Sequence, residues 1–284
     1  MSILITGANG YLGGYLLQAF GPLKALGLRR ARPGVMALPA MVEFDNHAEI
    51  EAILSAHKIS TVINVVGCYG RASEPLSELY NANLVFGQTL LEATSRSEAK
   101  LFINIGTSLP SCVSPYARTK NMFSAELIQQ RFEGLRTVNL ALEQFYGPNE
   151  HKQRFVGMVI DACQSNQPLA LTVGTQQRDF IHVDDIVGAI ETIIDKQAQL
   201  EDHESIALGS GKAVTVKAFV QQARLAFESS AVDDFGAVPM RTNELMHSEA
   251  DTHRLRSLGW AAQYTIANGL EQLATMQVKQ IQSA

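Results

Sequence analysis

The 284-residue sequence has few cysteines, no excess of basic residues and no long apolar run. Its three cysteines, Cys68, Cys112 and Cys163, stand in no metal-ligand spacing, which predicts reduced thiols and no metal site. A net charge of −5 gives no basic surface for a nucleic-acid backbone, so nucleic acid is not an expected partner. The longest apolar run, residues 61–66, is too short to cross a bilayer, and the N-terminus shows no leader pattern. We therefore expect a cytoplasmic protein with no membrane partner.

Short apolar segments alternate with amphipathic segments along the first half of the chain. The periodicity predicts strands at residues 2–6, 26–30, 42–45, 61–66, 101–105 and 137–142, and helices at residues 11–20, 47–57, 79–96 and 116–132. This alternation predicts the α/β class, with a Rossmann-type doubly wound parallel sheet. It ends after Gly147 and Pro148, beyond which helices are expected at residues 155–165 and 216–227. We expect a Rossmann domain at residues 1–148 and a smaller C-terminal lobe at residues 149–284, parts of which return to the Rossmann sheet.

A glycine-rich turn lies between the first predicted strand and the first predicted helix. The glycines allow a tight turn and a close backbone approach, and the helix N-terminus offers free N–H groups to a pyrophosphate. Their spacing of three and three differs from the two and three of the standard dinucleotide fingerprint and is typical of short-chain dehydrogenases. A purely structural turn is the alternative. The residues expected to bind a dinucleotide here are Gly7, Asn9, Gly10, Tyr11, Leu12 and Gly13.

Arginines, not an acidic residue, end the second predicted strand. NAD usually calls for a carboxylate about 20 residues after the glycines, and none is there. The strand ends with Arg29 and Arg30, and Arg32 follows. Guanidinium groups suit a 2′-phosphate, so we expect NADP(H), with NAD(H) as the second choice, and solvated arginines at a strand end as the alternative. The other expected cofactor contacts are Asp45 at the adenine and Val66 and Gly67 beneath the dinucleotide.

Tyr116 and Lys120 lie four residues apart at the start of a predicted helix and therefore share one face. A phenol with a pKa of about 10 is a poor acid or base at neutral pH, and a neighbouring ammonium lowers that pKa. Lysine also has the length to hold the nicotinamide ribose. Thr107 follows the fifth predicted strand, where its hydroxyl can donate to a carbonyl oxygen during hydride transfer. Ser108 is the alternate donor, and a turn role is the alternative for both. These residues predict an enzyme with Thr107, Tyr116 and Lys120 as its catalytic residues.

Several further motifs resemble those of the extended short-chain dehydrogenase/reductases, the NAD-dependent epimerase/dehydratase family of sugar-nucleotide enzymes. Residues 178–185, Arg-Asp-Phe-Ile-His-Val-Asp-Asp, nearly repeat a family signature. Residues 145–148, Phe-Tyr-Gly-Pro, are similar to the family's Val-Tyr-Gly-Pro. Asn83 begins a segment similar to Asn-Val-x-Gly-Thr, which implies a place near the cofactor and the active site. Arg241, ten residues before Asp251 of Ala-Asp-Thr, and the later Gly259-Trp260 match the family's tail.

The resemblance implies that Arg178 and Arg241 hold the nucleotide diphosphate of a sugar substrate in the C-terminal lobe. Two permanently charged, forked groups suit a pyrophosphate. Structural ion pairs are the alternative for both arginines, for instance between Arg178 and Asp184 or Asp185. The family often dimerises through the helix that carries the Tyr and Lys and the helix before it, which implies a homodimer.

Departures from the family pattern reduce the number of reactions that we expect this chain to catalyse. No Asp-Glu pair follows Thr107, so dehydration is not expected, and Tyr116 stands only nine positions after Thr107. The stretch from Thr107 to Lys120 looks most like the sugar-nucleotide 4-ketoreductases of O-antigen deoxysugar pathways. Ala141 and Gln144 replace the usual Arg and Asn before Tyr-Gly-Pro. We expect Gln144 and Ser108 to contact the sugar.

The expected function is NADPH-dependent reduction of the C4 ketone of a nucleotide-activated 4-keto-6-deoxyhexose. A second hypothesis is C4 epimerisation of a nucleotide sugar with retained NAD, which uses the same three catalytic residues. A third is a non-catalytic NADP-binding regulator, which the presence of both Tyr116 and Lys120 disfavours. The base, the sugar and its stereochemistry stay open.

Overall fold

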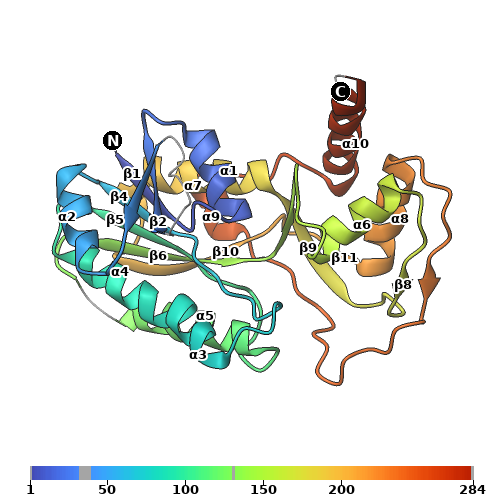
Figure 1. Ribbon diagram of the computed structural model, residues 1–284, viewed down its shortest axis with the longest axis horizontal. Helices are drawn as coiled ribbons and strands as arrows, with labels where there is room; N and C mark the ends of the chain where they lie inside the picture. The colour runs from blue at the N-terminus through green and yellow to red at the C-terminus, as the bar shows by residue number, and fades with distance from the viewer. Residues whose placement is uncertain (1, 32–39, 130–131, 283–284) are drawn as a thin grey trace. The chain divides into compact units, whose positions relative to one another are not determined.

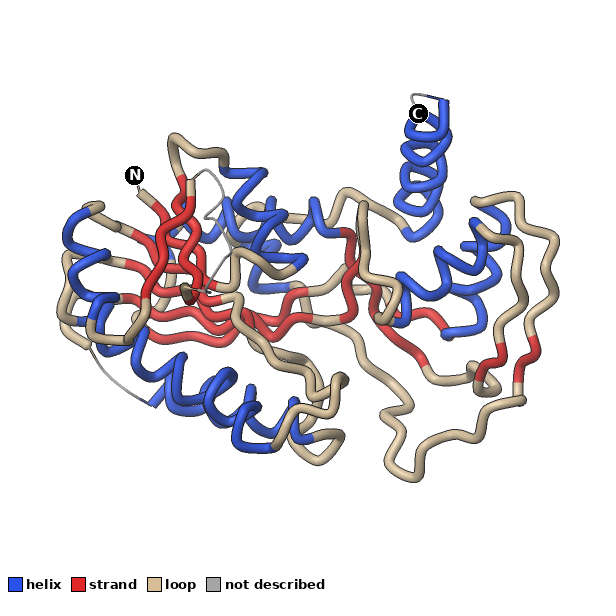
Figure 2. Tube along the Cα trace, viewed as in Figure 1, coloured by secondary structure: helices blue, strands red, loops and turns tan. Residues whose placement is uncertain are grey.

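The computed structural model describes residues 2–31, 40–129 and 132–282, and for residues 277–282 the backbone alone. The chain divides into two compact units (Figures 1 and 2). Unit 1 comprises Met1–Leu142 and Ile190–Ile206, and unit 2 comprises Glu143–Ala189 and Ala207–Ala284. The assignment of cofactor to the first part of the chain and of substrate to the second stays a prediction.

A seven-stranded sheet forms the centre of unit 1, in the order β10-β6-β5-β4-β1-β2-β3. The pairs from β1 to β6 are all parallel. The order of the first six strands is the Rossmann order, with the switch point between β1 and β4, and it confirms the predicted fold class. The strand bounds are β1 Ile3–Thr6, β2 Ala25–Arg30, β3 Met41–Phe44, β4 Thr61–Asn64, β5 Leu101–Ile105, β6 Arg136–Leu142 and β10 His203–Leu208.

Helices cover both faces of this sheet. Figure 1 shows α2, α4 and α5 on one face and α1 on the other. Because both faces are covered, every residue of β1, β4 and β5 is buried. The predicted helix at residues 79–96 is a continuous stretch of three parts, α3, the π-helical turn η1 and α4. The bounds are α1 Tyr11–Phe20, α2 Glu49–Ala56, α3 Leu76–Tyr80, η1 Asn81–Val85, α4 Phe86–Ser95, α5 Pro115–Gln129, α7 Val183–Asp195 and the short 3-10 helix η2 Gln197–Gln199.

A chain of side-chain hydrogen bonds crosses the buried sheet. The Thr6 hydroxyl donates to Asn64 Oδ1 (2.8 Å), and Asn64 Nδ2 donates to Asn104 Oδ1 (3.0 Å). Asn104 Nδ2 donates to Asn139 Oδ1 (2.9 Å), and Asn139 Nδ2 donates to the Ser205 hydroxyl (3.0 Å). We call these five residues the amide ladder. The three asparagines pair in register across β4, β5 and β6, so each amide both donates and accepts in a row.

Unit 2 is built from two small sheets and the helices that pack on them. Its core includes the fully buried rings of Tyr146, Phe180 and Phe219. The sheets have the orders β11-β9-β7 and β12-β8. The bounds are β7 Gln144–Tyr146, β8 Ala170–Leu171, β9 Gln177–His182, β11 Ala213–Thr215, β12 Asp234–Phe235, α6 Phe155–Gln164, α8 Val216–Ala226, α9 His253–Ser257 and α10 Ile266–Gln282. The helices predicted at residues 155–165 and 216–227 are α6 and α8, whereas none of these five strands was predicted.

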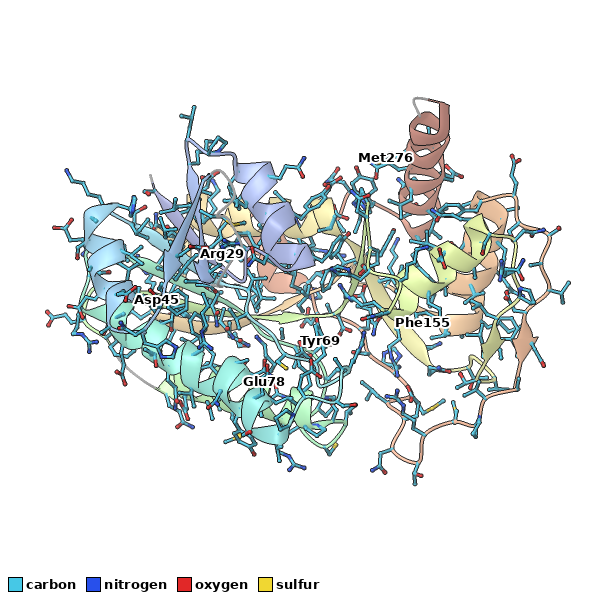
Figure 3. The ribbon with its side chains drawn as sticks, in the orientation of Figure 1. Arg29, Asp45, Tyr69, Glu78, Phe155 and Met276 are labelled. Atoms are coloured by element: carbon cyan, nitrogen blue, oxygen red, sulfur yellow. The ribbon has the colours of Figure 1, made fainter. Side chains whose placement is uncertain are left out.

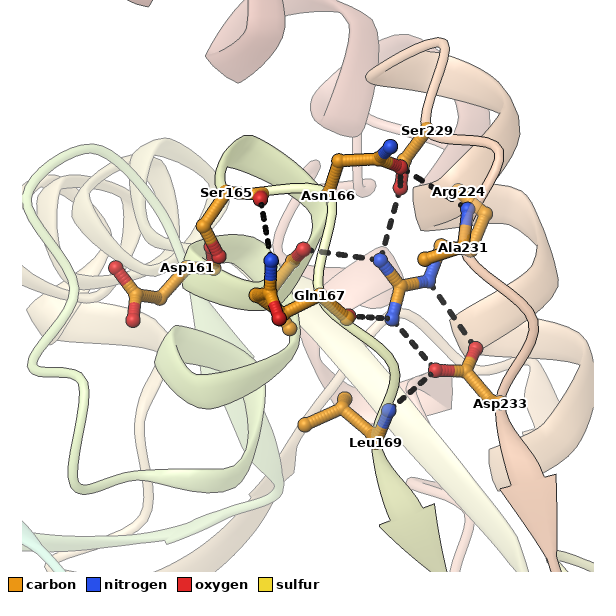
Figure 4. Close-up of polar contacts among 10 residues, drawn as sticks. Asp161, Ser165, Asn166, Gln167, Leu169, Arg224, Ser229, Ala231 and Asp233 are labelled. Carbon is orange, nitrogen blue, oxygen red and sulfur yellow. Dashed lines mark hydrogen bonds and ion pairs between the residues drawn. The ribbon is translucent and has the colours of Figure 1, made fainter.

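A buried arginine on α8 organises the polar interior of unit 2 (Figure 4). Arg224 is buried and forms a two-pronged ion pair with Asp233, with nitrogen–oxygen distances of 2.5 and 3.1 Å. It also donates to the carbonyl oxygens of Ala162 (3.0 Å) and Gln167 (2.7 Å). Asp233 in turn accepts from the backbone N–H of Leu169 (2.9 Å). This one guanidinium therefore joins the end of α6 to α8 and to the segments that lead into β8 and β12.

Within the described residues, no helix combines the length and the apolar character that a membrane span needs. In the same part of the chain, no three His, Cys, Asp or Glu side chains come together in a group that could hold a metal ion.

We expect Arg224→Met to lower the free energy of unfolding by about 3–5 kcal/mol, because it leaves a buried carboxylate without its counter-charge. The Asp233 side chain is only 4% exposed. The matched control is Arg96→Met, which removes the ion pair with Glu51 between side chains that are 57% and 47% exposed. Such a pair is worth about 1 kcal/mol or less. Urea unfolding of both variants measures the difference, and equal costs would contradict the role given to Arg224.

Candidate functional site

The glycine turn brings α1 directly against the end of β1. Gly7 has φ +66°, a conformation that favours glycine, and a Cβ there would lie 3.2 Å from the carbonyl carbon of Val65. A Cβ on Gly13 would clash with the Gly7 carbonyl group. The backbone N–H of Gly10 donates to the same carbonyl (2.8 Å). The turn therefore requires glycine at 7 and at 13 because neighbouring backbone occupies the space of a side chain.

The N-terminus of α1 fits the pyrophosphate of a dinucleotide. Gly10 is the N-cap residue and provides no side-chain cap, and the first turn of α1 has no acidic residue. Asn9 and Gly10 are exposed, Tyr11 is half-buried and Leu12 anchors the helix in the core. The first-turn N–H groups and the positive end of the helix dipole are thus available to an anion.

The two arginines at the end of β2 have different surroundings. Arg29 is buried, and its guanidinium forms an ion pair with Glu43 on β3, in which Nε donates to Oε1 (2.7 Å). Arg30 is exposed and makes no side-chain hydrogen bond or ion pair with another described residue. Arg30 therefore offers the guanidinium that a 2′-phosphate needs, whereas Arg29 shares its charge with Glu43. Arg32 lies outside the described residues.

Asp45 follows β3 directly and is exposed, as the expected contact to adenine requires (Figure 3). Its backbone N–H donates to the Glu49 carboxylate (3.0 Å) at the start of α2. The missed residue in this region is Glu43, which faces Arg29 in the β2–β3 register. Arg29 and Glu43 become neighbours only because β2 pairs with β3 in the sheet, and the sequence pattern did not show this contact.

Tyr116 and Lys120 both lie on α5, as predicted. Lys120 is 2% exposed, and its ammonium donates to the carbonyl oxygen of Val66 (3.0 Å) beyond β4. Burial lowers the pKa of Lys120 to about 8, because desolvation penalises the charged form. The Tyr116 side chain is half-buried. A lysine held in this way presents a hydrogen-bond donor one turn from the phenol.

The predicted hydroxyl donors follow β5. Thr107 is buried, and its hydroxyl oxygen accepts from the backbone N–H of Leu109 (3.2 Å). That bond uses a lone pair and leaves the hydroxyl proton for donation. Ser108 is half-buried, and its backbone N–H donates to the carbonyl of Leu142 (3.1 Å). Both stay predicted site residues.

Asn83 holds the loop after β4 to α5. Its Oδ1 accepts from the backbone N–H of Cys68 (2.8 Å), and its Nδ2 donates to the Cys68 carbonyl (2.9 Å) and to the Thr119 hydroxyl (2.9 Å). The side chain is buried, so both amide protons are used inside the protein. Asn83 lies in η1, and three residues stand between it and Gly87, compared with two in the family motif. A π-helical turn accommodates one such additional residue.

The amide ladder supports the same loop and the same helix. The backbone N–H groups of Val65 and Val66 donate to Thr6 Oγ1 (3.3 Å) and Asn64 Oδ1 (3.4 Å). On α5, the Ser124 hydroxyl lies 2.8 Å from Asn139 Oδ1 and 3.1 Å from the Lys120 carbonyl oxygen. The ladder therefore contacts both sides of the hydrogen bond between Lys120 and Val66.

In unit 2, Arg178 lies on β9 and is buried. Its guanidinium forms an ion pair with Glu244 (2.5 Å) and donates to the Gln177 carbonyl (2.7 Å). The carboxylate that pairs with Arg178 is Glu244, whereas the alternative prediction gave Asp184 or Asp185 as examples. Since Glu244 is three residues after Arg241, it belongs to the same segment as the second predicted arginine.

Asp185 has another role, because its carboxylate accepts from the backbone N–H groups of Gln263 (2.7 Å) and Tyr264 (3.1 Å). Arg241 is exposed and makes no side-chain hydrogen bond or ion pair with the residues the structure describes. Gln144 begins β7 opposite Phe180 and is half-buried. The contacts predicted for Arg178, Arg241 and Gln144 with a nucleotide sugar stay predictions.

Between pH 8 and 10.5, we expect the wild-type protein to gain stability relative to a Lys120→Met variant. The pKa of the lysine is 10.5 when it is exposed and about 8 in the fold. The native state therefore binds fewer protons than the unfolded chain in this window, so the free energy of unfolding rises with pH, by at most about 1.4 kcal/mol per pH unit. Below pH 8 the difference between the variants should be flat. Urea unfolding across this range measures it, and parallel profiles would contradict the burial of a titrating amine.

The chain is similar to known proteins over nearly its whole length. The model of the NAD dependent epimerase/dehydratase family matches residues 3–209. The chain is similar to CDP-abequose synthase from Salmonella muenchen, with 27% identity over 285 residues that cover 96% of this chain and 97% of that protein. It is also 26% identical to dTDP-6-deoxy-L-talose 4-dehydrogenase (NAD(P)(+)) from Kitasatospora kifunensis, over 97% of this chain and 95% of that protein.

Solved structures share the fold over the whole chain. UDP-glucose 4-epimerase from Thermotoga maritima, solved with UDP-glucose, matches with a TM-score of 0.84 and 18% identity, and 99% of this chain and 100% of that chain are covered. UDP-glucose 4-epimerase from Thermus thermophilus, solved with NAD, matches with a TM-score of 0.79 and 18% identity over 97% and 98% of the two chains. At this identity the likeness concerns the fold alone.

Proposed function

The chain belongs to the NAD dependent epimerase/dehydratase family, and we propose that it reduces the C4 ketone of a nucleotide-activated 4-keto-6-deoxyhexose with NADPH. The observation that carries the proposal is the buried Lys120, held on the Val66 carbonyl one turn after Tyr116. The reductive direction is supported by the short segment from Thr107 to Tyr116, nine positions later, which has no carboxylate for a dehydration. The names of the abequose synthase and deoxytalose dehydrogenase relatives support a nucleotide deoxysugar as the substrate.

In this proposal, Thr107 and Tyr116 act on the ketone oxygen, and Lys120 acts through Tyr116. NADPH, when bound, would supply the hydride for the new C4–H bond. The Thr107 hydroxyl donates a hydrogen bond to the oxygen as negative charge develops on it. The Tyr116 phenol transfers its proton to the same oxygen, which becomes the C4 hydroxyl, and solvent later returns a proton to the phenolate. The Lys120 ammonium stabilises that phenolate and holds the nicotinamide ribose.

We assign the nucleotide diphosphate to Arg178 and Arg241. Arg241 offers an exposed guanidinium, and Arg178 contributes a second one that it shares with Glu244. Two forked cations suit the charge and shape of a pyrophosphate. Ser108 and Gln144 are proposed contacts to the sugar.

We also propose a homodimer formed through α5 and the helix before it. The apolar side chains of Val85 and Met122 support this, since they are 41% and 38% exposed at the end of η1, directly before α4, and on α5. Exposed apolar groups on helices are a common feature of subunit interfaces.

Tyr116→Phe should lower kcat by about a hundredfold to ten-thousandfold, since it removes the proton donor but not the ring. The assay is NADPH consumption with 4-keto-6-deoxyhexoses carried on CDP, dTDP, UDP and GDP. The dissociation constant for NADPH should stay close to that of the wild type. Tyr80→Phe, which changes a tyrosine on α3, is the control. The proposal fails if no such substrate consumes NADPH, or if the product is a C4 epimer formed without net cofactor turnover.

Arg30→Ser should raise the dissociation constant of NADPH about tenfold to a hundredfold and leave that of NADH unchanged. The reason is the loss of a charge-assisted hydrogen bond to the 2′-phosphate, worth about 1.5–3 kcal/mol. Arg96→Ser, at an exposed arginine at the end of α4, is the control. Fluorescence titration with both cofactors measures the effect. Tighter binding of NADH than of NADPH by the wild-type protein would refute the preference.

A further inference from the structure

A second tyrosine lies against the catalytic phenol. The rings of Tyr69 and Tyr116 are stacked, with centroids 4.4 Å apart and planes at 22°. Tyr69 is 40% exposed and lies in the loop that follows β4 (Figure 3). The guanidinium carbon of Arg71 lies 5.0 Å from the centroid of the Tyr69 ring, a cation–π distance. No motif in the sequence pointed to Tyr69.

The backbone on both sides of Tyr69 is fixed. Cys68 exchanges two hydrogen bonds with the Asn83 side chain, through its N–H (2.8 Å) and its carbonyl (2.9 Å). Gly70 has φ +71°, and a Cβ there would lie 3.2 Å from Leu79 Cδ2, so this turn packs closely on α3. Tyr69 therefore enters the stack from a short segment that is held at both ends.

We propose that Tyr69 is a positioning residue that orients the Tyr116 ring for proton transfer, an inference that rests on the proposed function. Tyr69 covers one face of that ring. The phenol is attached through two rotatable bonds, so this contact restricts its rotation. Proton transfer requires a donor held in hydrogen-bond geometry, and a misplacement of about 1 Å can cost about a hundredfold in rate.

This role depends on the ring of Tyr69 and not on its hydroxyl. Phenylalanine keeps a stacked ring, whereas leucine keeps the apolar bulk without a flat π-face. The informative pair is therefore Tyr69→Phe and Tyr69→Leu. Leu76→Ala, at a 53% exposed apolar residue on α3, is the matched control for a surface change nearby. Both positions are exposed, so all three variants should fold.

The kinetic test compares kcat, KM and the solvent deuterium isotope effect on kcat in these variants. Tyr69→Leu should lower kcat about tenfold or more, keep KM within about twofold and raise the isotope effect, because the proton step becomes slower. Tyr69→Phe and Leu76→Ala should match the wild type in all three quantities. An unchanged kcat in Tyr69→Leu, or a change confined to KM, overturns the inference.

A second readout does not depend on turnover. In protein labelled with ¹³C at tyrosine Cζ, Tyr116→Phe identifies the Tyr116 signal. That signal should move in Tyr69→Leu, which lacks the ring current of a stacked neighbour, and should stay close to its wild-type position in Tyr69→Phe and Leu76→Ala. An unmoved signal in Tyr69→Leu overturns the stack itself. Full activity of Tyr116→Phe would overturn the proposed function, whereas an inactive Tyr116→Phe beside a fully active Tyr69→Leu overturns this inference alone.

Discussion

The hydrogen bond between Lys120 and the Val66 carbonyl is the constraint on which the candidate site depends. An ammonium that is 2% exposed is costly to bury unless a fixed acceptor faces it. Here the acceptor is fixed by the amide ladder, through the Asn64 side chain that contacts the Val66 N–H. A one-residue slip of β4 against β5 would turn Asn64 to the other face of the sheet and break the ladder at that step. The register of the central strands therefore also determines the position of α5 and its lysine.

Close packing of backbone imposes the second constraint. A Cβ on Gly7 would lie 3.2 Å from the Val65 carbonyl carbon, so the glycine turn rests directly on the loop after β4. That loop also contacts Tyr116 and Lys120 of α5 through Tyr69 and Val66. Asn83 of η1 joins the same loop to Thr119 of α5. Tyr116, Thr119 and Lys120 are spaced i, i+3 and i+4 and share one helix face. A single short loop and its η1 anchor thus set the distance from the glycine turn to Tyr116 and Lys120.

Much of unit 1 could be predicted from the sequence because its strands are buried on both faces and alternate with long helices. The glycine turn, Tyr116 and Lys120 were found by spacing along the chain. The amide ladder was not, since Asn64, Asn104 and Asn139 are 40 and 35 residues apart and become neighbours only through strand order. The ion pair between Arg29 and Glu43 could not be predicted for the same reason. The strands of unit 2 were missed because several have only two or three residues, too few to show a period.

Tyr69 marks the limit of motif-based prediction in the site. A single aromatic residue in a glycine-rich loop carries no spacing signal, and its stack on Tyr116 follows only from the backbone anchors at Cys68 and Gly70. Hydride and proton transfer need donors placed to within about 0.5 Å, which supporting contacts provide and the reacting groups alone do not. In this chain those supporting contacts are made by ordinary residues of the loop after β4. Variation among related enzymes in the orientation of the catalytic phenol should therefore follow changes in this loop more closely than changes in the Tyr-x-x-x-Lys segment.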